Sequence, residues 1–296
     1  MTRHILVTGG QGQVGLELAR QDWPTDITMH YPTRETCDIG SQASLFTYLR
    51  SYSFDAIINC AAYTAVDKAE EDRDTAFRVN GEAPGWLADT GTPLIHLSTD
   101  YVFDGTKTGY YSEDDPVAPL GVYGASKREG ERAVQAGQSR SVILRTAWVI
   151  SARRANFLKT MLRVAAGNPV VRVVDDQHGC PTSAQDIASA LRVIALRLIE
   201  DLDAPLGVHH FVNRGEATWY ELAREIFALS AAAGGPSAEV EAITTADYPT
   251  LAKRPVNSRL SISKITANYG IHPRDWRAAL RDIIDELVGP VPQTGA

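Results

Sequence analysis

Tyr123 and Lys127 are the two side chains in this sequence whose spacing points most directly to chemistry. Residues four apart on a helix share one face, so a phenol and an ammonium would lie close together. A nearby cation favours the phenolate, and we therefore expect Lys127 to lower the pKa of Tyr123 from its usual value of about 10. Such a pair can transfer a proton. The same spacing also occurs by chance in helices that have no catalytic function.

Thr99 adds a hydroxyl at the carboxyl end of the apolar run at residues 92–98. Ligands of open α/β sheets bind outside the carboxyl ends of the strands. We therefore predict that Thr99, Tyr123 and Lys127 form a catalytic group around a substrate carbonyl. In the alternative interpretation, Thr99 makes a turn hydrogen bond and Tyr123 is a surface residue.

A glycine-rich segment lies near the N-terminus, with Gly9, Gly12 and Gly15 spaced three apart between an expected strand and an expected helix. Glycines in such a turn permit a tight bend, a close approach of the backbone to a pyrophosphate, and close packing of helix on sheet. The start of the helix then faces the phosphates with free N–H groups. The segment predicts a dinucleotide site, the alternative being a glycine-rich turn without a ligand.

The residue that faces the adenosine ribose decides between NADH and NADPH. An acidic residue about 20 positions after the glycines favours NAD, and Glu35 has that spacing, but the strand at residues 27–30 ends without a carboxylate. Arg34 and His30 could instead face a 2′-phosphate. We therefore favour NADPH, and NADH is the other possibility. In the alternative interpretation of Arg34, it is a solvated surface charge.

In this sequence, short apolar runs alternate with helix-patterned stretches. This pattern is typical of βα repeats and a parallel sheet, whose elements would position these residues. The expected strands are residues 5–7, 27–30, 56–59, 92–98 and 142–146, and the expected helices are residues 14–20, 42–52 and 126–135. Right-handed crossovers then build a doubly wound sheet. After the third strand come Ala61, Ala62 and Tyr63, where small residues suit either a flat ring passing close by or dense core packing.

The second half is less regular, with expected strands at residues 170–174 and 208–212 and expected helices at residues 186–200 and 218–233. Thr218 and Glu221 form a capping-box pattern at the start of the last helix. Residues 232–237 are a turn-rich break, and the tail at residues 288–296 is expected to fray.

We predict an α/β fold, a Rossmann-type doubly wound parallel sheet with a smaller C-terminal α/β substrate-binding domain. The dinucleotide-binding domain is expected to take residues 1–150 plus about 182–212, and the substrate-binding domain about 151–181 and 213–296.

The composition is that of an ordinary globular protein, with 296 residues and a formal net charge of −7. This charge argues against a broadly basic surface for nucleic acid. Cys37, Cys60 and Cys180 are far apart and lack a metal-ligand spacing, as expected for reduced thiols. No apolar run approaches the roughly 18–20 residues that cross a bilayer, and the first strand leaves no room for a signal peptide. We expect a cytoplasmic protein without nucleic-acid or membrane partners.

These motifs resemble the extended short-chain dehydrogenases/reductases and, more closely, the dTDP-4-dehydrorhamnose reductase family, from about residue 5 to residue 287. The glycine turn and the Tyr-x-x-x-Lys spacing are shared across the superfamily. Four stretches are much more specific: TDYVFDG at 99–105, RTAWV at 145–149, DQHGCPT at 176–182 and RPVNSRL at 254–260.

The resemblance implies an NAD(P)-dependent oxidoreductase. In that family, NADPH or NADH delivers hydride to the C4 ketone of dTDP-4-dehydro-β-L-rhamnose and yields dTDP-β-L-rhamnose, the last step of dTDP-L-rhamnose biosynthesis. By the resemblance, Tyr123 supplies the proton, Lys127 tunes it and holds the nicotinamide ribose, and Thr99 hydrogen-bonds the oxygen that gains charge.

The resemblance also implies the binding residues. The cofactor positions that match are Gly12, Gln13, Val14, Asp38, Ile39, Ala61, Ala62 and Tyr63, to which the turn and the second strand add Gly9 and Arg34. The substrate contacts that match are Thr99, Asp100 and Trp148. Trp148 would pack against a sugar or base, or else it would be a tryptophan of the core. Arg254 and Arg259 are candidate diphosphate clamps, or else structural residues.

Some family members use acidic residues to bridge a Mg²⁺ ion between subunits. Glu17 and Glu286 match two of those places, but Gln185 stands at the third. This weakens the case for Mg²⁺ and for that dimer, and we predict no metal-binding residues. Glu17 is otherwise a solvated or dipole-favouring helix residue. A monomer and a homodimer both stay open.

Three classes of function compete. The first is the nucleotide-sugar ketoreductase, and the second is another nucleotide-sugar ketoreductase, epimerase or dehydratase. Asp100 beside Thr99 keeps a dehydratase open, but Tyr101 stands where a dehydratase has glutamate. The third is a catalytically silent, NADP-binding regulatory subunit, which would more often have lost part of the group formed by Thr99, Tyr123 and Lys127.

Overall fold

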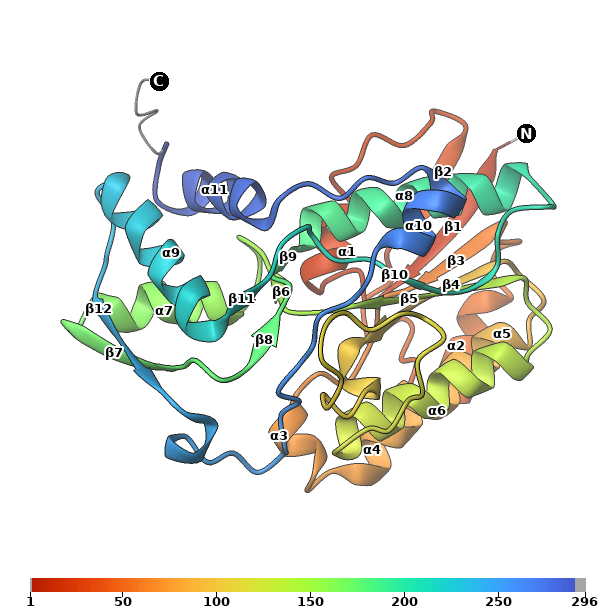
Figure 1. Cartoon of the computed structure of the whole chain (residues 1–296). Coiled ribbons are helices and arrows are strands. Elements are labelled where there is room, and N and C mark those ends of the chain that lie inside the picture. Colours follow the sequence, from red (N-terminus) through yellow and green to blue (C-terminus); the bar gives the residue numbers. More distant parts are fainter. Residues whose placement is uncertain (1, 291–296) are drawn as a thin grey trace.

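A parallel six-stranded sheet organises the first two thirds of the chain (Figure 1). The computed structural model describes residues 2–290. From edge to edge the strands are β10 (Gly207–His210), β5 (Ser141–Thr146), β4 (Leu94–Thr99), β3 (Ala56–Asn59), β1 (Arg3–Thr8) and β2 (Ile27–His30). All neighbours in this sheet run parallel. The chain builds outward from β1 in both directions, which confirms the predicted Rossmann-type doubly wound order.

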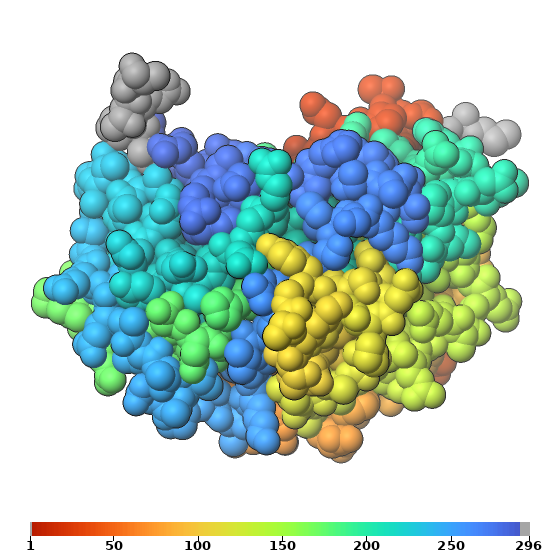
Figure 2. Space-filling model, in the orientation of Figure 1, coloured from red at the N-terminus to blue at the C-terminus, as the bar shows by residue number. Residues whose placement is uncertain are grey.

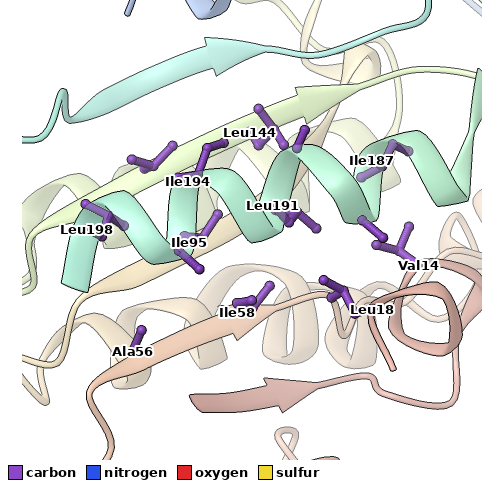
Figure 3. Packing of buried hydrophobic residues seen from close by; sticks show 14 of the residues in the cluster. Val14, Leu18, Ala56, Ile58, Ile95, Leu144, Ile187, Leu191, Ile194 and Leu198 are labelled. Carbon is purple, nitrogen blue, oxygen red and sulfur yellow. The ribbon is translucent and has the colours of Figure 1, made fainter. Parts of the chain in front are cut away.

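Helices cover both faces of the sheet because successive strand residues point to opposite sides. Ile5 and Val7 of β1 lie in one apolar core, while Leu6 lies in the other. The first core is covered by α1 (Gln13–Leu18) and α8 (Ala184–Glu200), and the second by α2 (Gln42–Leu49), α5 (Ala83–Ala88) and α6 (Val122–Ala136). Figure 3 shows the apolar side chains of α1 and α8 lying over those of the sheet.

Shorter elements connect the strands. The segment between β3 and α5 contains α3 (Val66–Ala69), α4 (Arg73–Phe77) and the π-helical η1 (Arg78–Glu82), and the 3₁₀ turn η2 (Asp100–Val102) follows β4. The rest of the chain forms β6 (Val149–Ile150), α7 (Phe157–Ala165), β7 (Val170–Val174), β8 (His178–Gly179), β9 (Thr182–Ser183), β11 (Ala217–Thr218), α9 (Trp219–Ala232), β12 (Glu239–Ile243), η3 (Thr245–Asp247), α10 (Ser263–Tyr269) and α11 (Trp276–Leu287).

A separate apolar core lies among α7, α9, α11 and β7, at the left of Figure 1. Trp276 of α11 is fully buried in it. β12 pairs in parallel with β7 beside this core, and α10 returns to the core of the main sheet. The division into a dinucleotide-binding and a substrate-binding domain stays a prediction.

The end of the chain also returns to the loop that follows η2. The amide of Asn257 donates 2.7 Å hydrogen bonds to the carbonyls of Lys107 and Gly109, and Leu260 forms a β-bridge with Tyr111. Figure 2 shows the blue C-terminal segments against the yellow surface of this loop. None of the helices within residues 2–290 has both the length and the apolar character that crossing a membrane needs.

Most predicted elements are present, with shifted ends. α6 begins at Val122 instead of residue 126 because the carboxylate of Glu70 accepts a 2.8 Å hydrogen bond from the N–H of Val122. Thr218 and Glu221 form the predicted capping box at the start of α9. The expectation of a frayed tail falls largely on residues 291–296, outside the described residues.

Candidate active site

A groove of about 890 Å³ follows the carboxyl ends of β1 to β5. It is lined by segments that directly follow these strands, as expected for a ligand site in a doubly wound sheet. Most of the predicted site residues line it: Gly9, Gly12, Gln13, Val14, Arg34, Asp38, Ile39, Ala61, Ala62, Tyr63, Thr99, Asp100, Tyr123, Lys127 and Trp148.

The glycine-rich turn forms one end of the groove and needs its glycines. Gly9 has a φ of +69°, and a Cβ there would lie 2.5 Å from the backbone nitrogen of Ala61. A Cβ on Gly15 would lie 2.5 Å from the Cα of Gly10, so the turn and α1 are in backbone contact. At Gly12 a Cβ would meet only the carbonyl of Gly9, at 3.2 Å. The turn therefore offers open backbone at Gly12, a cradle that fits a pyrophosphate.

Of the three candidates for the adenosine 2′-position, only Arg34 lines the groove. Its side chain is 78% exposed, and its Nε lies 3.5 Å from a carboxylate oxygen of Asp38. His30 points elsewhere because its ring hydrogen-bonds His4 and packs against Tyr52. The alternative in which His30 faces a 2′-phosphate is therefore wrong.

Thr99, Asp100 and Tyr123 meet in the middle of the groove. The hydroxyl of Thr99 donates to Asp100 at 3.0 Å and accepts from the N–H of Tyr101 at 3.2 Å. Burial raises the pKa of Tyr123 to about 12, while a hydrogen bond with Thr99 acts in the opposite direction and the charge of Asp100 raises it further. The phenol therefore holds its proton at neutral pH.

Lys127 is directed to the floor of the groove. Its ammonium donates a 2.7 Å hydrogen bond to the carbonyl of Leu97 and lies 3.3 Å from Nε2 of His96. Burial lowers the pKa of Lys127 to about 8, against an opposing effect of Glu131. The prediction that Lys127 lowers the pKa of Tyr123 is wrong, because burial of the phenol dominates and the ammonium is bonded to the backbone of β4.

Asp100 lines the groove and is almost fully buried. Burial raises its pKa to about 6, although the side chains of Ser258 and Thr99 act to lower it. Its Oδ2 and the hydroxyl of Thr146, which also lines the groove, are buried without a hydrogen bond of good geometry within residues 2–290. Buried polar groups of this kind are costly unless they gain a hydrogen bond.

Trp148 forms a wall of the groove in an unusual backbone conformation. Its φ is +48°, and its ring stacks on Trp219 with centroids 3.6 Å apart and planes 9° apart. A Cβ on Gly179 would lie 2.2 Å from the Trp148 ring, so only glycine fits beneath it. Neither Gly179 nor Trp219 was predicted as a site residue. The motif at 176–182 was the only signal in the sequence for Gly179.

Arg254 and Arg259 do not line the groove. Arg254 lies 2.6 Å from a carboxylate oxygen of Asp67, and Arg259 lies 3.1 Å from Glu216. The prediction of Arg254 as a substrate contact and diphosphate clamp therefore does not fit the structure, since its guanidinium is held in an ion pair elsewhere.

Glu131 and Arg145 form a buried ion pair that fixes α6 to the sheet. The carboxylate accepts from Nε and Nη2 of Arg145 at 2.7 and 2.8 Å, and from the hydroxyl of Ser98 at 2.7 Å. Glu131 follows Lys127 by one helical turn, so this pair sets how α6 presents Tyr123 and Lys127. Arg145 belongs to a specific motif, but no role for it could be predicted from the sequence.

The two glutamates considered for Mg²⁺ share a guanidinium. Nε of Arg153 lies 3.4 Å from Glu17, and its Nη2 pairs with Glu286. Within residues 2–290 there is no group of three or more His, Cys, Asp or Glu side chains arranged to hold a metal ion. With neutral Gln185 at the third place, these residues do not fit the ion.

Comparison with known proteins gives a consistent result along nearly the whole chain. The model of the family described as RmlD substrate binding domain matches residues 3–288. The dTDP-4-dehydrorhamnose reductase of Sinorhizobium fredii is 42% identical over 289 residues, which cover 96% of this chain and 97% of that protein.

Two solved structures are similar in fold and sequence. A dTDP-4-dehydrorhamnose reductase from Clostridium acetobutylicum has a TM-score of 0.89 and 34% identity, covering 96% of this chain and 99% of that chain. The dTDP-4-dehydrorhamnose reductase from Bacillus anthracis, solved in complex with NADP, has a TM-score of 0.88 and 30% identity, covering 97% and 100%.

Proposed function

This chain belongs to the RmlD substrate-binding-domain family, and we propose that it is an NAD(P)-dependent oxidoreductase that reduces the C4 ketone of dTDP-4-dehydro-β-L-rhamnose to dTDP-β-L-rhamnose. The observation that carries this proposal is one continuous groove, which begins at the glycine turn and contains Thr99, Tyr123 and Lys127. Relatives that share this family are named for that reaction.

The cofactor in the proposal is NADPH, which would supply the hydride when bound. The open backbone at Gly12 suits the pyrophosphate, and the small side chains of Ala61 and Ala62 leave room for a flat ring. Arg34 is the cation that follows β2 in the groove, which supports a 2′-phosphate and hence NADPH over NADH. A relative's complex with NADP is consistent with this choice.

Tyr123 is proposed as the proton donor to the C4 oxygen. With a pKa raised to about 12, its phenol stays protonated until the oxygen becomes strongly basic. An alkoxide is more basic than a phenolate, so transfer becomes favourable as charge develops on that oxygen. The hydroxyl of Thr99 lines the same groove and donates to Asp100 in the structure, and it would turn to the C4 oxygen to share that charge.

Lys127 and Asp100 are proposed to orient the reactants. A charged Lys127 can hold a ribose hydroxyl and stabilise developing negative charge, since its ammonium has one more N–H than the two contacts at Leu97 and His96 use. Asp100, which lines the groove, would accept a hydrogen bond from a sugar hydroxyl. Trp148 closes the substrate side with a rigid aromatic wall.

The test is NADPH oxidation, followed at its absorbance band, with dTDP-4-dehydro-L-rhamnose and with other 4-keto sugars. We expect stoichiometric oxidation that is fastest with dTDP-4-dehydro-L-rhamnose. Net oxidation would exclude an epimerase, and preference for a different sugar would assign another nucleotide-sugar ketoreductase. No oxidation with any of them, despite bound NADPH, would support a silent NADP-binding subunit instead.

A further inference from the structure

Arg154 is a strained, exposed residue on the wall of the groove to which neither the sequence motifs nor the proposed reaction assigns a role. It lies in the loop between β6 and α7 with a φ of +56°. Within residues 2–290, Trp148 and Arg154 are the non-glycine residues with positive φ, and both line the groove. Such backbone conformations persist where the surroundings impose them, and they gather at ligand sites.

The loop of Arg154 is tied to the glycine-rich turn at two points. Nε of Arg154 donates a 2.7 Å hydrogen bond to the carbonyl of Gln11. The amide of Asn156 donates a 2.9 Å hydrogen bond to the side-chain carbonyl of Gln13. The guanidinium is therefore fixed beside the turn although its side chain is exposed.

The two outer nitrogens of this guanidinium have no partner in the described part of the chain, since its bond to Gln11 uses Nε alone. The neighbouring Arg153 behaves differently, because Glu17 and Glu286 neutralise it. A planar guanidinium with a free pair of N–H donors matches two phosphate oxygens. Arg154 thus has the chemistry of an anion clamp that is already oriented.

We propose that Arg154 clamps the diphosphate of the dinucleotide, with Nε anchored on Gln11 and both Nη groups donating to diphosphate oxygens. This inference rests on the proposed function. The diphosphate is the matching anion because Arg154 is anchored on the turn after β1, where a pyrophosphate approaches glycine backbone. The 2′-phosphate belongs with Arg34, which follows β2 instead.

The experiment compares the dissociation constants of NADPH and NADH for the unaltered chain, Arg154→Gly and Arg154→Lys. Glycine accepts the positive φ, so Arg154→Gly removes the guanidinium and also relieves the backbone. Arg154→Lys keeps the charge without the fork. Arg163→Ala is the matched control, since it removes another exposed arginine that does not line the groove. Thermal unfolding midpoints verify that each variant is folded.

We expect Arg154→Gly to weaken NADPH and NADH alike, by about 10-fold to 100-fold, the range for a charge-assisted bidentate contact. The dissociation constants of Arg154→Lys should lie between those of the unaltered chain and those of Arg154→Gly. Those of Arg163→Ala should match the unaltered chain. Unchanged binding by Arg154→Gly overturns the clamp, and so does a loss confined to NADPH, which would assign Arg154 to the 2′-phosphate. An unaltered chain that binds neither dinucleotide overturns the proposed function itself.

Discussion

At the scale of single residues, the proton donor is the sharpest assignment to test. Tyr123→Phe removes only the hydroxyl, and we expect kcat to fall by about 10²-fold to 10⁴-fold, the usual contribution of a general acid. The dissociation constant of NADPH should change little. Steady-state turnover and a cofactor titration measure the two effects. Tyr52→Phe, the same change at an exposed position outside the groove, is the control. Unchanged turnover would remove Tyr123 from the mechanism.

Two buried groups in the groove predict a bell-shaped dependence of kcat/KM on pH. Burial raises the pKa of Asp100 to about 6 and lowers that of Lys127 to about 8. The proposed reaction uses ionised Asp100 and charged Lys127, so kcat/KM should rise as the pH passes about 6 and fall as it passes about 8. Initial rates across a range that brackets both values measure it.

Asp100→Asn separates the two limbs of that profile. The acidic limb should disappear while the alkaline limb stays, since Glu131 and Cys60, which act on the pKa of Lys127, are unchanged. An acidic limb that survives in Asp100→Asn would assign that ionisation to another group.

That Thr99, Tyr123 and Lys127 line one groove could be predicted from the sequence, because spacing and strand ends place them without further knowledge. The pKa of Tyr123 could not, because its direction depends on how deeply the phenol is buried. Arg154 was missed for a similar reason, since its anchor on Gln11 joins residues that are 143 positions apart.

At the scale of elements, α6 depends on a buried ion pair. Glu131→Gln leaves the guanidinium of Arg145 without a charged partner in the core. Removing one member of a buried pair costs about 3–5 kcal/mol, which corresponds to a fall of about 5–15 °C in the thermal midpoint of a chain of this size. Glu129→Gln, on the exposed side of the same helix, is the control and should shift the midpoint little. Equal midpoints for the two variants would contradict this role.

The stack of Trp148 on Trp219 couples the groove to α9. Trp219→Ala removes the surface that holds Trp148 in its positive-φ conformation. We expect the KM for the nucleotide sugar to rise about 10-fold, because aromatic contacts of this kind contribute about 0.5–1.5 kcal/mol beyond area burial. The dissociation constant of NADPH should stay the same, and Trp219→Phe should recover much of the loss. A parallel loss of NADPH affinity would indicate general damage instead.

The start of α6 shows where prediction of elements fails. The helical pattern was visible from residue 126, but the cap comes from Glu70, 52 residues earlier in the chain. A single sequence gives no sign that this carboxylate reaches Val122. The capping box of α9 could be predicted because Thr218 and Glu221 are neighbours. Local signals are readable, whereas caps supplied by tertiary structure are not.

At the scale of the whole molecule, the parallel sheet could be predicted because its strands are apolar on successive residues and alternate with helices. β12 was missed because its exposed residues Glu239 and Glu241 break the apolar pattern. Its partner β7 lies about 70 residues earlier and pairs with it at the edge of the smaller core. The fold of the cofactor side therefore follows from pattern, whereas that of the C-terminal part depends on long-range pairing.

Arg153 forms one ion pair with Glu17 of α1 and another with Glu286 of α11. It therefore links a helix of the main sheet to a helix of the separate C-terminal core. A divalent ion would have to displace this guanidinium, so we expect neither Mg²⁺ nor a chelator to change turnover or the thermal midpoint. In Arg153→Ala, the buried Glu17 loses one of the two cations that lower its pKa and keeps only the more exposed Arg20 against the charge of Glu286. We expect the midpoint to fall by about 2–6 °C and Mg²⁺ to restore part of it. Arg20→Ala, which removes the more exposed of the two arginines that pair with Glu17, is the control. A midpoint of the unaltered chain that rises with Mg²⁺ would show that the ion has a site despite Arg153.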